Sequence, residues 1–479
     1  MRRLLSGPAS YGAELASAVG RAWNRFFFTP ADPTPLGLIR VAVGLLAIWN
    51  LLVYGLDLHA FLGSNGWADP AAVRQVMGER TPWAWSFWLL VPDSFLVPVW
   101  LLCLLVLVLS TIGLWSRLTT VLAWVIIVSA ARRVPVGLYG FDQVLSTLAL
   151  YLAVCTASGQ AVSLDRFLAR LRLARAEVAR RRPGGHWKFT PGAPAPTTSA
   201  NLGLRLIQLH LVLIYGIAGL AKLQGQAWWT GVAAWGVVAA GEFRVFNLTW
   251  MAAYPLLLNL MTHAGLFLEL SYPILIWVRV LRPLLITAML MMHLGIDLTL
   301  GLAEFGLAML AGNIAFMSGP WLRSLVAGQC QPAGRVLYDG ACPRCRASMA
   351  VLVAADPDQV IEPVDLTAVD VGTLHPSLTP AACRRAMHLV RANGQVDLGF
   401  NAVRTLGLWI PFSSPLAIFG KFPGIALIGS AIYNALAANR SRDHSCTNET
   451  CGLHPPAAPQ PPKPGGGAPA AAQTGRPST

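Results

Sequence analysis

Cys342 and Cys345 are the residues whose types and spacing point most directly to chemistry. They belong to the segment Cys342-Pro343-Arg344-Cys345, which follows a short apolar run and an Asp339-Gly340 turn. At the N-terminus of a helix, unpaired backbone N–H groups and the helix dipole favour a thiolate, so Cys342 is the predicted nucleophile. Cys345 lies one turn later on the same face and can attack a mixed disulfide formed at Cys342. The pattern predicts thiol-disulfide exchange.

The residues around this pair predict the elements that hold it. Pro343 suits the first turn of a helix, and the side chains of Arg344 and Arg346 should lower the pKa of a nearby thiol. The alternation of apolar and polar residues, with an Asn393-Gly394 turn, predicts strands at 334–338, 360–366, 386–390 and 396–398 and helices at 344–354, 400–408 and 424–438. These elements predict a small α/β thioredoxin-like domain over 334–446.

The chain has eight cysteines, and a zinc site is the alternative to redox chemistry. A second pair, Cys446 and Cys451, stands beside His444 and His454. The long and irregular spacing between the two pairs is unlike that of zinc ribbons or fingers, so we expect no metal site and regard the second pair as exposed thiols. The other cysteines are predicted to be buried small side chains (Cys103 and Cys155) or incidental (Cys330 and Cys383).

The composition before this domain is that of a membrane protein. Of 479 residues, 55% are hydrophobic and 12% are charged, and 17 are Trp. Apolar segments near the length that crosses a bilayer predict a polytopic α-helical bundle of about eight spans. We place them at 35–56, 84–108, 112–131, 139–158, 203–223, 262–280, 283–301 and 302–319.

The distribution of arginines predicts the orientation. The loop 162–200 holds the strongest arginine cluster, so the positive-inside rule places it, the N-terminal segment 1–33 and the C-terminal domain in the cytoplasm. Arg132 and Arg133 would then lie outside. Residues 164–178 read as an amphipathic helix on the inner leaflet. The segment 34–322 forms the transmembrane domain, and the Pro/Ala/Gly tail 453–479 should be disordered. We expect a multi-pass protein of a bacterial inner (plasma) membrane. The net charge of +14 comes with no nucleic-acid-binding module, so the expected partner is the lipid bilayer.

Ionisable residues inside the predicted spans are candidates for a second site. They include Asp142, Arg205, His210, Lys222, His263, Glu269, His293, Asp297 and Glu304. The simpler interpretation is that they pair across the bundle, with His293 near Asp297 and Glu304 meeting Arg205 or Lys222. Lys222 is the exception, because a buried amine can act as a base.

The segment Val336-Leu337-Tyr338-Asp339-Gly340-Ala341-Cys342-Pro343-Arg344-Cys345 resembles the strand and DGxCxxC motif of DCC thiol-disulfide oxidoreductase-like proteins. Later stretches, 399–403 and 433–440, are similar to the second half of that family. The resemblance covers 335–446 and implies that Asp339, Gly340, Cys342 and Cys345 form the active loop. No proline directly precedes the third strand, and Pro380 comes too early, so the substrate-facing cis-proline of ordinary thioredoxins is unassigned.

The membrane region 33–320 resembles the HTTM (horizontally transferred transmembrane) domain, which includes the vitamin K-dependent gamma-carboxylases. The segment 215–223, followed by Trp229-Thr230-Gly231, is similar to the stretch that bears their catalytic lysine, and Lys222 matches that position. The segments 138–142 and 163–166 also correspond. The histidine that the carboxylases carry would fall near Pro135, and no large propeptide-recognition domain follows. The resemblance implies a pocket for a quinone or vitamin K-like compound more than it implies glutamate carboxylation.

These observations leave three hypotheses. The first is a membrane-anchored protein-disulfide reductase that acts on protein or small-molecule thiols and disulfides, with no certain cofactor and a quinone-like compound as the candidate. The second is a quinol-dependent carboxylase-like enzyme centred on Lys222. The third is a non-enzymatic membrane scaffold.

Overall fold

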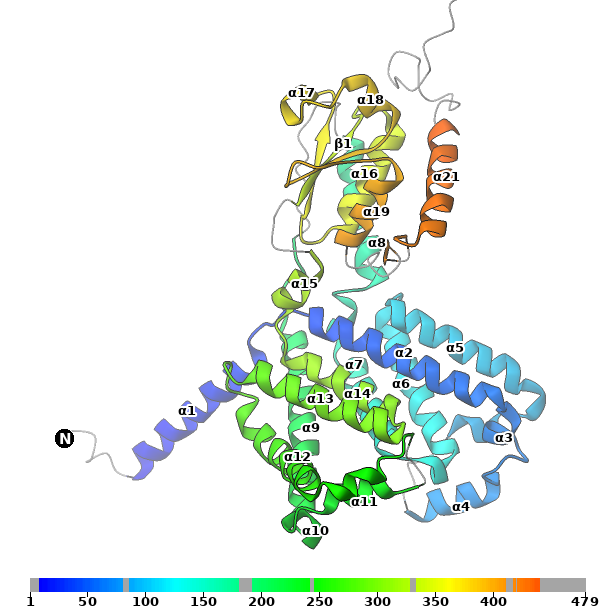
Figure 1. The fold of residues 1–479 in the computed structure, drawn as a ribbon, viewed down its shortest axis with the longest axis vertical. Coiled ribbons are helices and arrows are strands. Elements are labelled where there is room, and N and C mark those ends of the chain that lie inside the picture. Colours follow the sequence, from blue (N-terminus) through cyan, green and yellow to red (C-terminus); the bar gives the residue numbers. More distant parts are fainter. Residues whose placement is uncertain are drawn as a thin grey trace, which may run out of the picture.

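The fold has two parts, a helical part followed by a smaller α/β part (Figure 1). The computed structural model describes residues 8–80, 86–180, 192–241, 245–327, 333–410, 417–418 and 420–439. The helical part is formed by the chain up to 327, and the α/β part begins with the strand at Gly334. The predicted tail 453–479 lies outside the described residues.

The helices before the sheet are α1 (Pro8–Phe28), α2 (Thr34–Leu56), α3 (Leu58–Leu62), α4 (Pro70–Arg80), α5 (Leu96–Ile112), α6 (Ser116–Arg133), α7 (Gly140–Val154), α8 (Leu164–Arg180), α9 (Thr198–Lys222), α10 (Gln226–Trp229), α11 (Ala233–Ala239), α12 (Pro255–Leu275), α13 (Arg282–Leu300), α14 (Ala303–Asn313) and α15 (Gly319–Ala327). Most of these lie in the lower body of Figure 1, from which α1 projects to the left, whereas α8 and α15 lie above it.

The helical part has fewer candidate spans than the sequence predicts. Within the described residues, four helices are long and apolar enough to cross a membrane: Thr34–Leu56, Asp93–Ile112, Thr198–Lys222 and Arg282–Leu300. A fifth would be a broken span, Ala303–Phe316 with Gly319–Leu325, which is bent by 116°. The prediction of eight spans is therefore not supported, although apolar helices indicate association with a membrane.

The remaining predicted spans fail for different physical reasons. α7 has only 15 residues, which is too short to cross a hydrocarbon layer of about 30 Å. α6 carries arginines at both ends, and Arg133 is buried, donating hydrogen bonds to the carbonyls of Leu62, Gly63 and Ala68. α12 is long enough but contains Asn259, His263 and Glu269, which lower its hydropathy. Apolar composition alone does not reveal these features.

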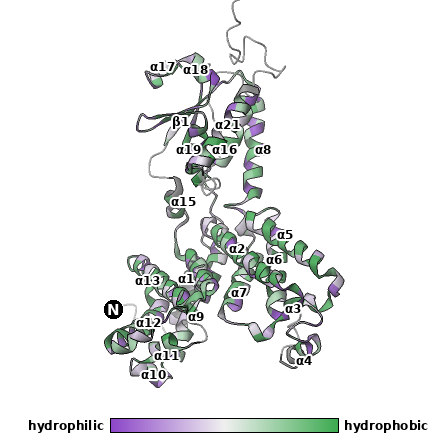
Figure 2. Ribbon diagram, turned by 45° about the vertical axis from the view of Figure 1, so that its right-hand side comes forward, coloured by the Kyte–Doolittle hydropathy of each residue, from purple (hydrophilic) through white to green (hydrophobic). Residues whose placement is uncertain are grey.

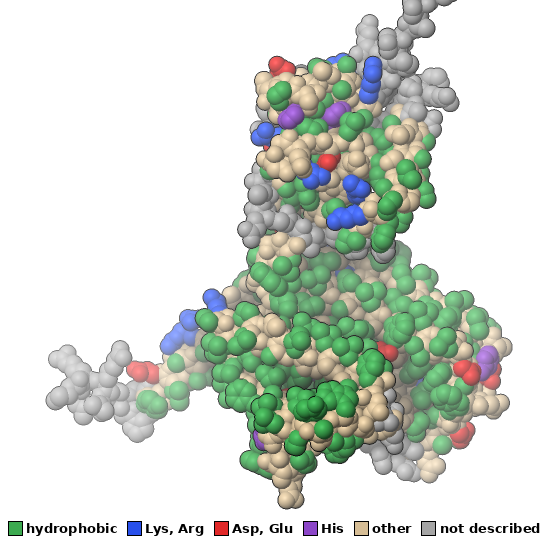
Figure 3. All heavy atoms as spheres, viewed as in Figure 1, with side chains coloured by type: hydrophobic (Ala, Val, Ile, Leu, Met, Phe, Trp, Pro, Cys, Tyr) green, Lys and Arg blue, Asp and Glu red, His purple; other side chains and the backbone are tan. Residues whose placement is uncertain are grey.

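One continuous core holds the bundle together. It contains fully buried side chains from several helices, among them Leu36 and Ile39 of α2, Leu107 of α5 and Tyr272 of α12. Opposite faces of the same helices are apolar but exposed, as at Leu101, Leu102 and Leu105 of α5. Figure 2 shows that the helical ribbons are mostly hydrophobic, and Figure 3 shows the apolar surface that results. An exposed apolar surface of this extent is expected of a protein that faces lipid.

The α/β part contains one sheet of four strands in the order β2-β1-β3-β4. The strands are β1 (Gly334–Tyr338), β2 (Ile361–Asp365), β3 (His388–Arg391) and β4 (Val396–Leu398). β1 is parallel to β2 and antiparallel to β3, and β4 is antiparallel to β3. Central β1 is buried on both faces, with Val336 and Tyr338 in one apolar cluster and Leu337 in another.

The helices of this part are α16 (Pro343–Ala355), α17 (Val371–Leu374), α18 (Pro380–Arg385), α19 (Phe400–Trp409) and α21 (Pro423–Asn439). The predicted strands and three of these helices are confirmed to within two residues at each end. Sequence reasoning missed the short helices α17 and α18. The parallel β1-α16-β2 unit, the β3-β4 hairpin and the helix after it form a small α/β domain, as predicted, and its thioredoxin-like character stays a prediction.

Helix α8 connects the two parts. It rises from the helical part and lies beside α16 (Figure 1), where Leu171 and Ala174 pack against Ala350 and Ala354. The prediction of an amphipathic helix here is confirmed, but its apolar face is covered by the α/β part instead of the inner leaflet. The apolar face of α8 is thus buried against protein, whereas the sequence analysis expected it to be buried in lipid.

Candidate functional site

The loop between β1 and α16 is fixed by backbone hydrogen bonds to two carboxylates. The amide of Ala341 donates to Asp339 Oδ1 at 3.0 Å, and the amide of Gly340 donates to Asp365 Oδ1 at 3.0 Å. The amide of Cys342 donates to the carbonyl of Asp339 at 3.2 Å. This tight turn ends at Cys342, where α16 begins.

Gly340 permits the close approach of this loop to β2. A Cβ atom at position 340 would lie 1.9 Å from Oδ2 of Asp365, which is closer than any real contact. The glycine that the DGxCxxC resemblance places in the active loop therefore has a steric reason to be there. Asp365 is a site residue that sequence reasoning missed, because nothing local links it to a loop 25 residues away.

Cys342 is the residue immediately before the first turn of α16, and its side chain is only 2% exposed. No disulfide joins Cys342 and Cys345 in this structure. A hydrogen bond from Cys345, together with the backbone amides of Cys345 and Arg344, lowers the pKa of Cys342 to about 6, against the opposing effect of burial. At neutral pH Cys342 is therefore mainly a thiolate, as the nucleophile of an exchange reaction must be.

Pro343 and Arg344 lie where the sequence predicts them, in the first turn of α16. The expected electrostatic help from arginine side chains takes a different form. Arg344 stabilises the thiolate through its backbone N–H, and the Arg346 guanidinium donates to the backbone carbonyl of Val178 on α8. The lowered pKa of Cys342 thus rests on hydrogen bonds at a helix N-terminus.

Asp339 is a buried carboxyl group beside the nucleophile. Burial raises the pKa of Asp339, and its negative charge raises the pKa of Cys342. Its Oδ2 atom has no hydrogen-bond partner among the described residues. A buried carboxylate with a spare acceptor is suited to receive a proton during exchange.

The position before β3 is held by Ala386 and Met387, whereas Pro380 begins α18. The amide of Met387 donates a hydrogen bond to the hydroxyl oxygen of Tyr433 on α21 at 2.9 Å. Met387 and Cys345 contact the same apolar cluster beside the sheet. The sequence analysis did not identify a residue in place of the substrate-facing proline. Met387 could have been identified, because it directly precedes the third strand.

The other cysteines fall into two groups. Cys103 and Cys155 are buried, as predicted, and Cys383 is buried on the sheet face opposite α16. Burial raises the pKa of Cys383, so this thiol is unreactive by comparison with Cys342. Cys330, His444, Cys446, Cys451 and His454 lie outside the described residues, so the expectation that they form no metal site stays a prediction, with zinc as its alternative.

Lys222 lies at the end of α9 and forms an ion pair with Glu269 of α12. Its Nζ atom is 2.5 Å from Oε2 of Glu269 and 5.2 Å from the ring centre of Trp228. This pairing fits the simpler interpretation for two of the candidates. The predicted pairing of Glu304 with Arg205 or Lys222 is wrong, because Glu304 accepts a hydrogen bond from Trp49 and Arg205 contacts Phe26 and Gln208.

The remaining polar candidates are dispersed over separate helix contacts. His293 shares a 2.9 Å hydrogen bond with Tyr215, whose hydroxyl also receives one from Asn313. Asp297 lies against Gly306, and among the described residues no hydrogen bond or ion pair joins it to His293, so that predicted pair is not formed. Asp142 caps the start of α7 at Tyr139, and His210 contacts Tyr151. His263 contacts Asn259 within its own helix. These contacts are of the kind that stabilise helix packing.

The Lys222 pair and the cysteine pair lie at opposite ends of the molecule. Thr197, at the start of α9, forms a β-bridge with Ala31 near the α/β part, whereas Lys222 ends the same helix. With 25 residues, α9 is about 37 Å long. Figure 1 shows α10, which follows Lys222, at the end of the molecule away from α16. Direct chemistry between the two groups is therefore excluded in this conformation.

Comparison with known proteins bears on the cysteine site alone. No curated protein and no solved structure matches the chain. The model of one family, described as DCC1-like thiol-disulfide oxidoreductase, matches residues 336–444, which begin in β1 and include the whole active loop. The match does not extend into the helical part, so the resemblance of 33–320 to HTTM proteins remains a prediction. The C-terminal part of this chain is thus supported as a DCC1-like thiol-disulfide oxidoreductase domain.

Proposed function

We propose that this protein is a membrane-anchored thiol-disulfide oxidoreductase in which Cys342 is the nucleophile and Cys345 the resolving thiol. The observation that carries the proposal is the lowered pKa of Cys342, about 6, at the N-terminus of a helix that follows a family-specific loop. A thiolate in this position attacks disulfides faster than an ordinary cysteine at neutral pH.

The reaction proceeds in two exchanges. The Cys342 thiolate attacks one sulfur of a substrate disulfide, forms a mixed disulfide and releases the other substrate sulfur as a thiolate. Cys345 loses its proton, for which Asp339 is the proposed acceptor, and attacks Cys342. This step releases the second substrate thiolate and leaves a Cys342–Cys345 disulfide. The substrate gains two electrons, and a dithiol reductant in solution returns the pair to its reduced form.

The proposed place of the domain is the cytoplasmic face of the inner membrane. Helix α8 carries Arg166, Arg170, Arg172, Arg175 and Arg180 and packs directly on α16. The arginine-rich helix and the cysteine domain therefore lie on the same side of the bilayer. The positive-inside rule favours the cytoplasm for that side. The four candidate spans would supply the anchor.

Coupling to a quinone-like compound, or carboxylase-like chemistry at Lys222, gains no support from the geometry. The Lys222 amine is matched by Glu269, and its distance from Cys342 leaves no direct route for electrons. The oxidoreductase proposal needs neither.

The test is the redox equilibrium of purified full-length protein against reduced and oxidised glutathione, with the thiol state of each cysteine read by mass spectrometry. We expect a reversible Cys342–Cys345 disulfide that is lost in both Cys342→Ser and Cys345→Ser. Cys383→Ser is the matched control, because it removes a buried thiol from the same domain and should leave the equilibrium unchanged. An unchanged wild-type dithiol across the whole range of glutathione potentials contradicts the proposal.

A further inference from the structure

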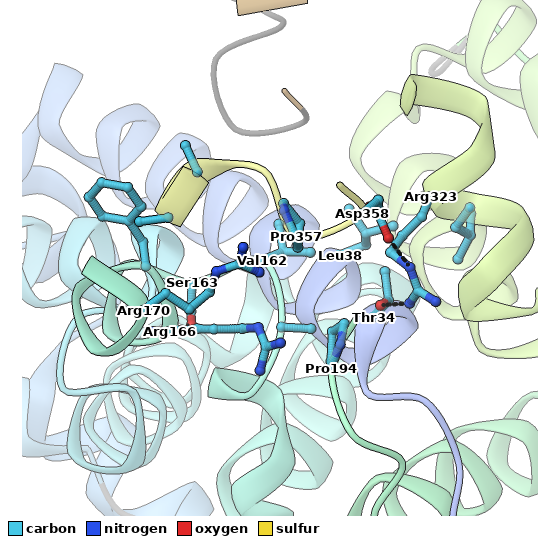
Figure 4. Close-up of a pocket in the computed structure, with 15 residues that line it drawn as sticks. Thr34, Leu38, Val162, Ser163, Arg166, Arg170, Pro194, Arg323, Pro357 and Asp358 are labelled. Carbon is cyan, nitrogen blue, oxygen red and sulfur yellow. Dashed lines mark hydrogen bonds and ion pairs between the residues drawn. The ribbon is translucent and has the colours of Figure 1, made fainter. Parts of the chain in front are cut away.

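A cavity of about 200 Å³ lies where the helical part meets the α/β part, away from the cysteine pair. Its walls come from the start of α2, the loop before α8, α8 itself, α15 and the end of α16 (Figure 4). α16 has 13 residues, so its two ends are about 20 Å apart, and a molecule in this cavity does not touch Cys342.

The cavity is apolar with a cationic side. Leu38, Phe167, Leu322, Ala354 and Ala355 line it with carbon, and the cations are Arg166, Arg170 and Arg323. Two carboxylates, Asp32 and Asp358, both contact Arg323, with Asp358 Oδ1 3.0 Å from its Nε. Asp358 also acts electrostatically on Arg166 and Arg170, and Asp32 and Asp356 lie close behind the wall. Within the lining itself, three arginines face one carboxylate, Asp358.

Arg170 is the residue that most clearly points to a ligand. It is 5% exposed, and its Nη2 atom donates to the carbonyls of Val353 at 2.9 Å and Asp356 at 2.8 Å, at the end of α16. Its Nε and Nη1 atoms are buried and have no partner among the described residues. Burial lowers the pKa of Arg170 only to about 10, so it remains a cation. Unpaired donors on a buried cation are costly unless an anion accepts from them.

A second unpaired group, on the other side of the cavity, indicates which other functional group the ligand must carry. Oδ2 of Asp358 is buried and has no hydrogen-bond partner among the described residues. A molecule that fits both groups has an anionic oxygen for Arg170 and a hydrogen-bond donor for Asp358. A glycerol headgroup linked through phosphate has both, and the apolar walls suit the start of an acyl chain.

The position of the cavity identifies the source of such a group. Thr34 and Leu38 belong to the first turns of the candidate span Thr34–Leu56, so the cavity lies at the level where a bilayer surface would begin. Basic pockets at this level, next to membrane helices, are where anionic lipid headgroups bind. We propose that the cavity binds the phosphate headgroup of an anionic membrane phospholipid, held by Arg170 and Arg166, at the junction of the two parts.

The experiment is native mass spectrometry of delipidated full-length protein in a neutral detergent, titrated with dioleoyl-phosphatidylglycerol. We expect one lipid bound at saturation. Arg170→Gln should weaken its affinity by about tenfold or more, because a charged donor to phosphate is lost. Arg172→Gln, which removes the same charge from an exposed position on α8, should leave affinity within about twofold, since a solvated charge contributes little.

A second pair of variants covers the case in which Arg170→Gln loosens the junction. Leu38→Trp fills the cavity and leaves every polar group in place, so it should also weaken binding by about tenfold or more through lost space. Leu45→Trp makes the same change at an exposed position of α2 outside the cavity and should have no effect.

Two further probes test separately whether binding needs the phosphate and whether it needs the acyl chains. Dioleoylglycerol has the chains without the phosphate, and glycerol phosphate has the headgroup without the chains. We expect both to bind far more weakly than phosphatidylglycerol. Equal binding of dioleoylglycerol would show that the arginines are irrelevant, and equal binding of glycerol phosphate would assign the cavity to a soluble anion. An equal loss of lipid affinity in Arg170→Gln and Arg172→Gln would show that the lipid responds to general surface charge and not to the cavity. Any of these three results overturns the proposal.

Discussion

The cysteine loop and the Lys222–Glu269 pair both place an ionisable group at the end of a helix, but they stabilise it differently. The Cys342 sulfur is stabilised by neutral donors, namely the Cys345 thiol and backbone amides. Lys222 is stabilised by a full opposite charge 2.5 Å away. A thiolate stabilised by neutral dipoles keeps its negative charge available to attack a disulfide. An ammonium group paired with a carboxylate has its charge neutralised by that partner. The difference explains why we assign chemistry to the first region and packing to the second.

Removing the nucleophile should have the largest effect. Cys342→Ser should lower the rate of reduction of a small aromatic disulfide by about 1000-fold or more, because a hydroxyl does not replace a thiolate in exchange. Lys222→Met, which removes the amine of the Lys222–Glu269 pair, should leave that rate within about twofold of the wild-type rate. Stopped-flow absorbance of the released thiol measures both. A comparable loss in Lys222→Met would break the comparison, since it would give the membrane residue a part in the exchange reaction.

Breaking the ion pair should affect stability instead of exchange. Glu269→Gln leaves Lys222 without its carboxylate and should lower the free energy of unfolding by about 1 to 2 kcal/mol, less than for a fully buried pair, because the Lys222 side chain is 26% exposed. The double variant Lys222→Met/Glu269→Leu should recover most of this loss. Thermal unfolding in detergent, followed by circular dichroism, gives the two values. Failure of the double variant to recover stability would argue that Lys222 is held for a purpose other than packing.

Gly340→Ala should damage the cysteine loop through sterics. The added methyl group would meet the Asp365 carboxylate, which must move, and we expect a loss of about 2 kcal/mol in the stability of the α/β part. Gly424→Ala in α21 is the control, because its added methyl group meets nothing within 4 Å and alanine favours a helix. Hydrogen exchange of the β1 and α16 amides reports the difference. Equal protection in the two variants would contradict the role of Gly340.

The smallest effect should come from the carboxylate beside the nucleophile. The charge of Asp339 raises the pKa of Cys342, so Asp339→Asn should lower that pKa further and shift the onset of thiolate reactivity to lower pH. Asparagine keeps an oxygen that can accept from the amide of Ala341, so the loop should be retained. The pH dependence of alkylation at Cys342 measures the shift, and a shift to higher pH would show that Asp339 acts by another route.

Local patterns were enough to predict the four strands and the three longer helices of the α/β part, but not the short helices α17 and α18. The strand 334–338, the helix after Cys342 and the hairpin at Asn393-Gly394 are each set by residues next to one another in the chain. The residues that complete the site were not predictable in this way. Asp365 reaches Gly340 only because β2 pairs in parallel with β1, and Arg346 reaches Val178 only because α8 packs on α16.

The helical part shows the same limit. Hydropathy located most of its helices but overcounted spans, since it does not register that α7 is short or that the chain bends by 116° after α14. The partner of Lys222 was likewise beyond the sequence, because Glu269 was one of several acidic candidates and the packing of α9 on α12 selected it. The number of spans and the partner of Lys222 both depend on tertiary contacts, which the sequence alone does not reveal.

The pKa of Cys342 tests the central claim most directly. It is measured from the pH dependence of iodoacetamide alkylation, followed at the Cys342 peptide by mass spectrometry, in wild type, Cys345→Ser and Cys345→Ala. Because a hydrogen bond from Cys345 is the largest cause of the lowered pKa, we predict a value of about 6 in wild type, near that value in the serine variant, and clearly higher in the alanine variant. A wild-type rate that rises only near the ordinary thiol pKa, unchanged by either substitution, would contradict the account.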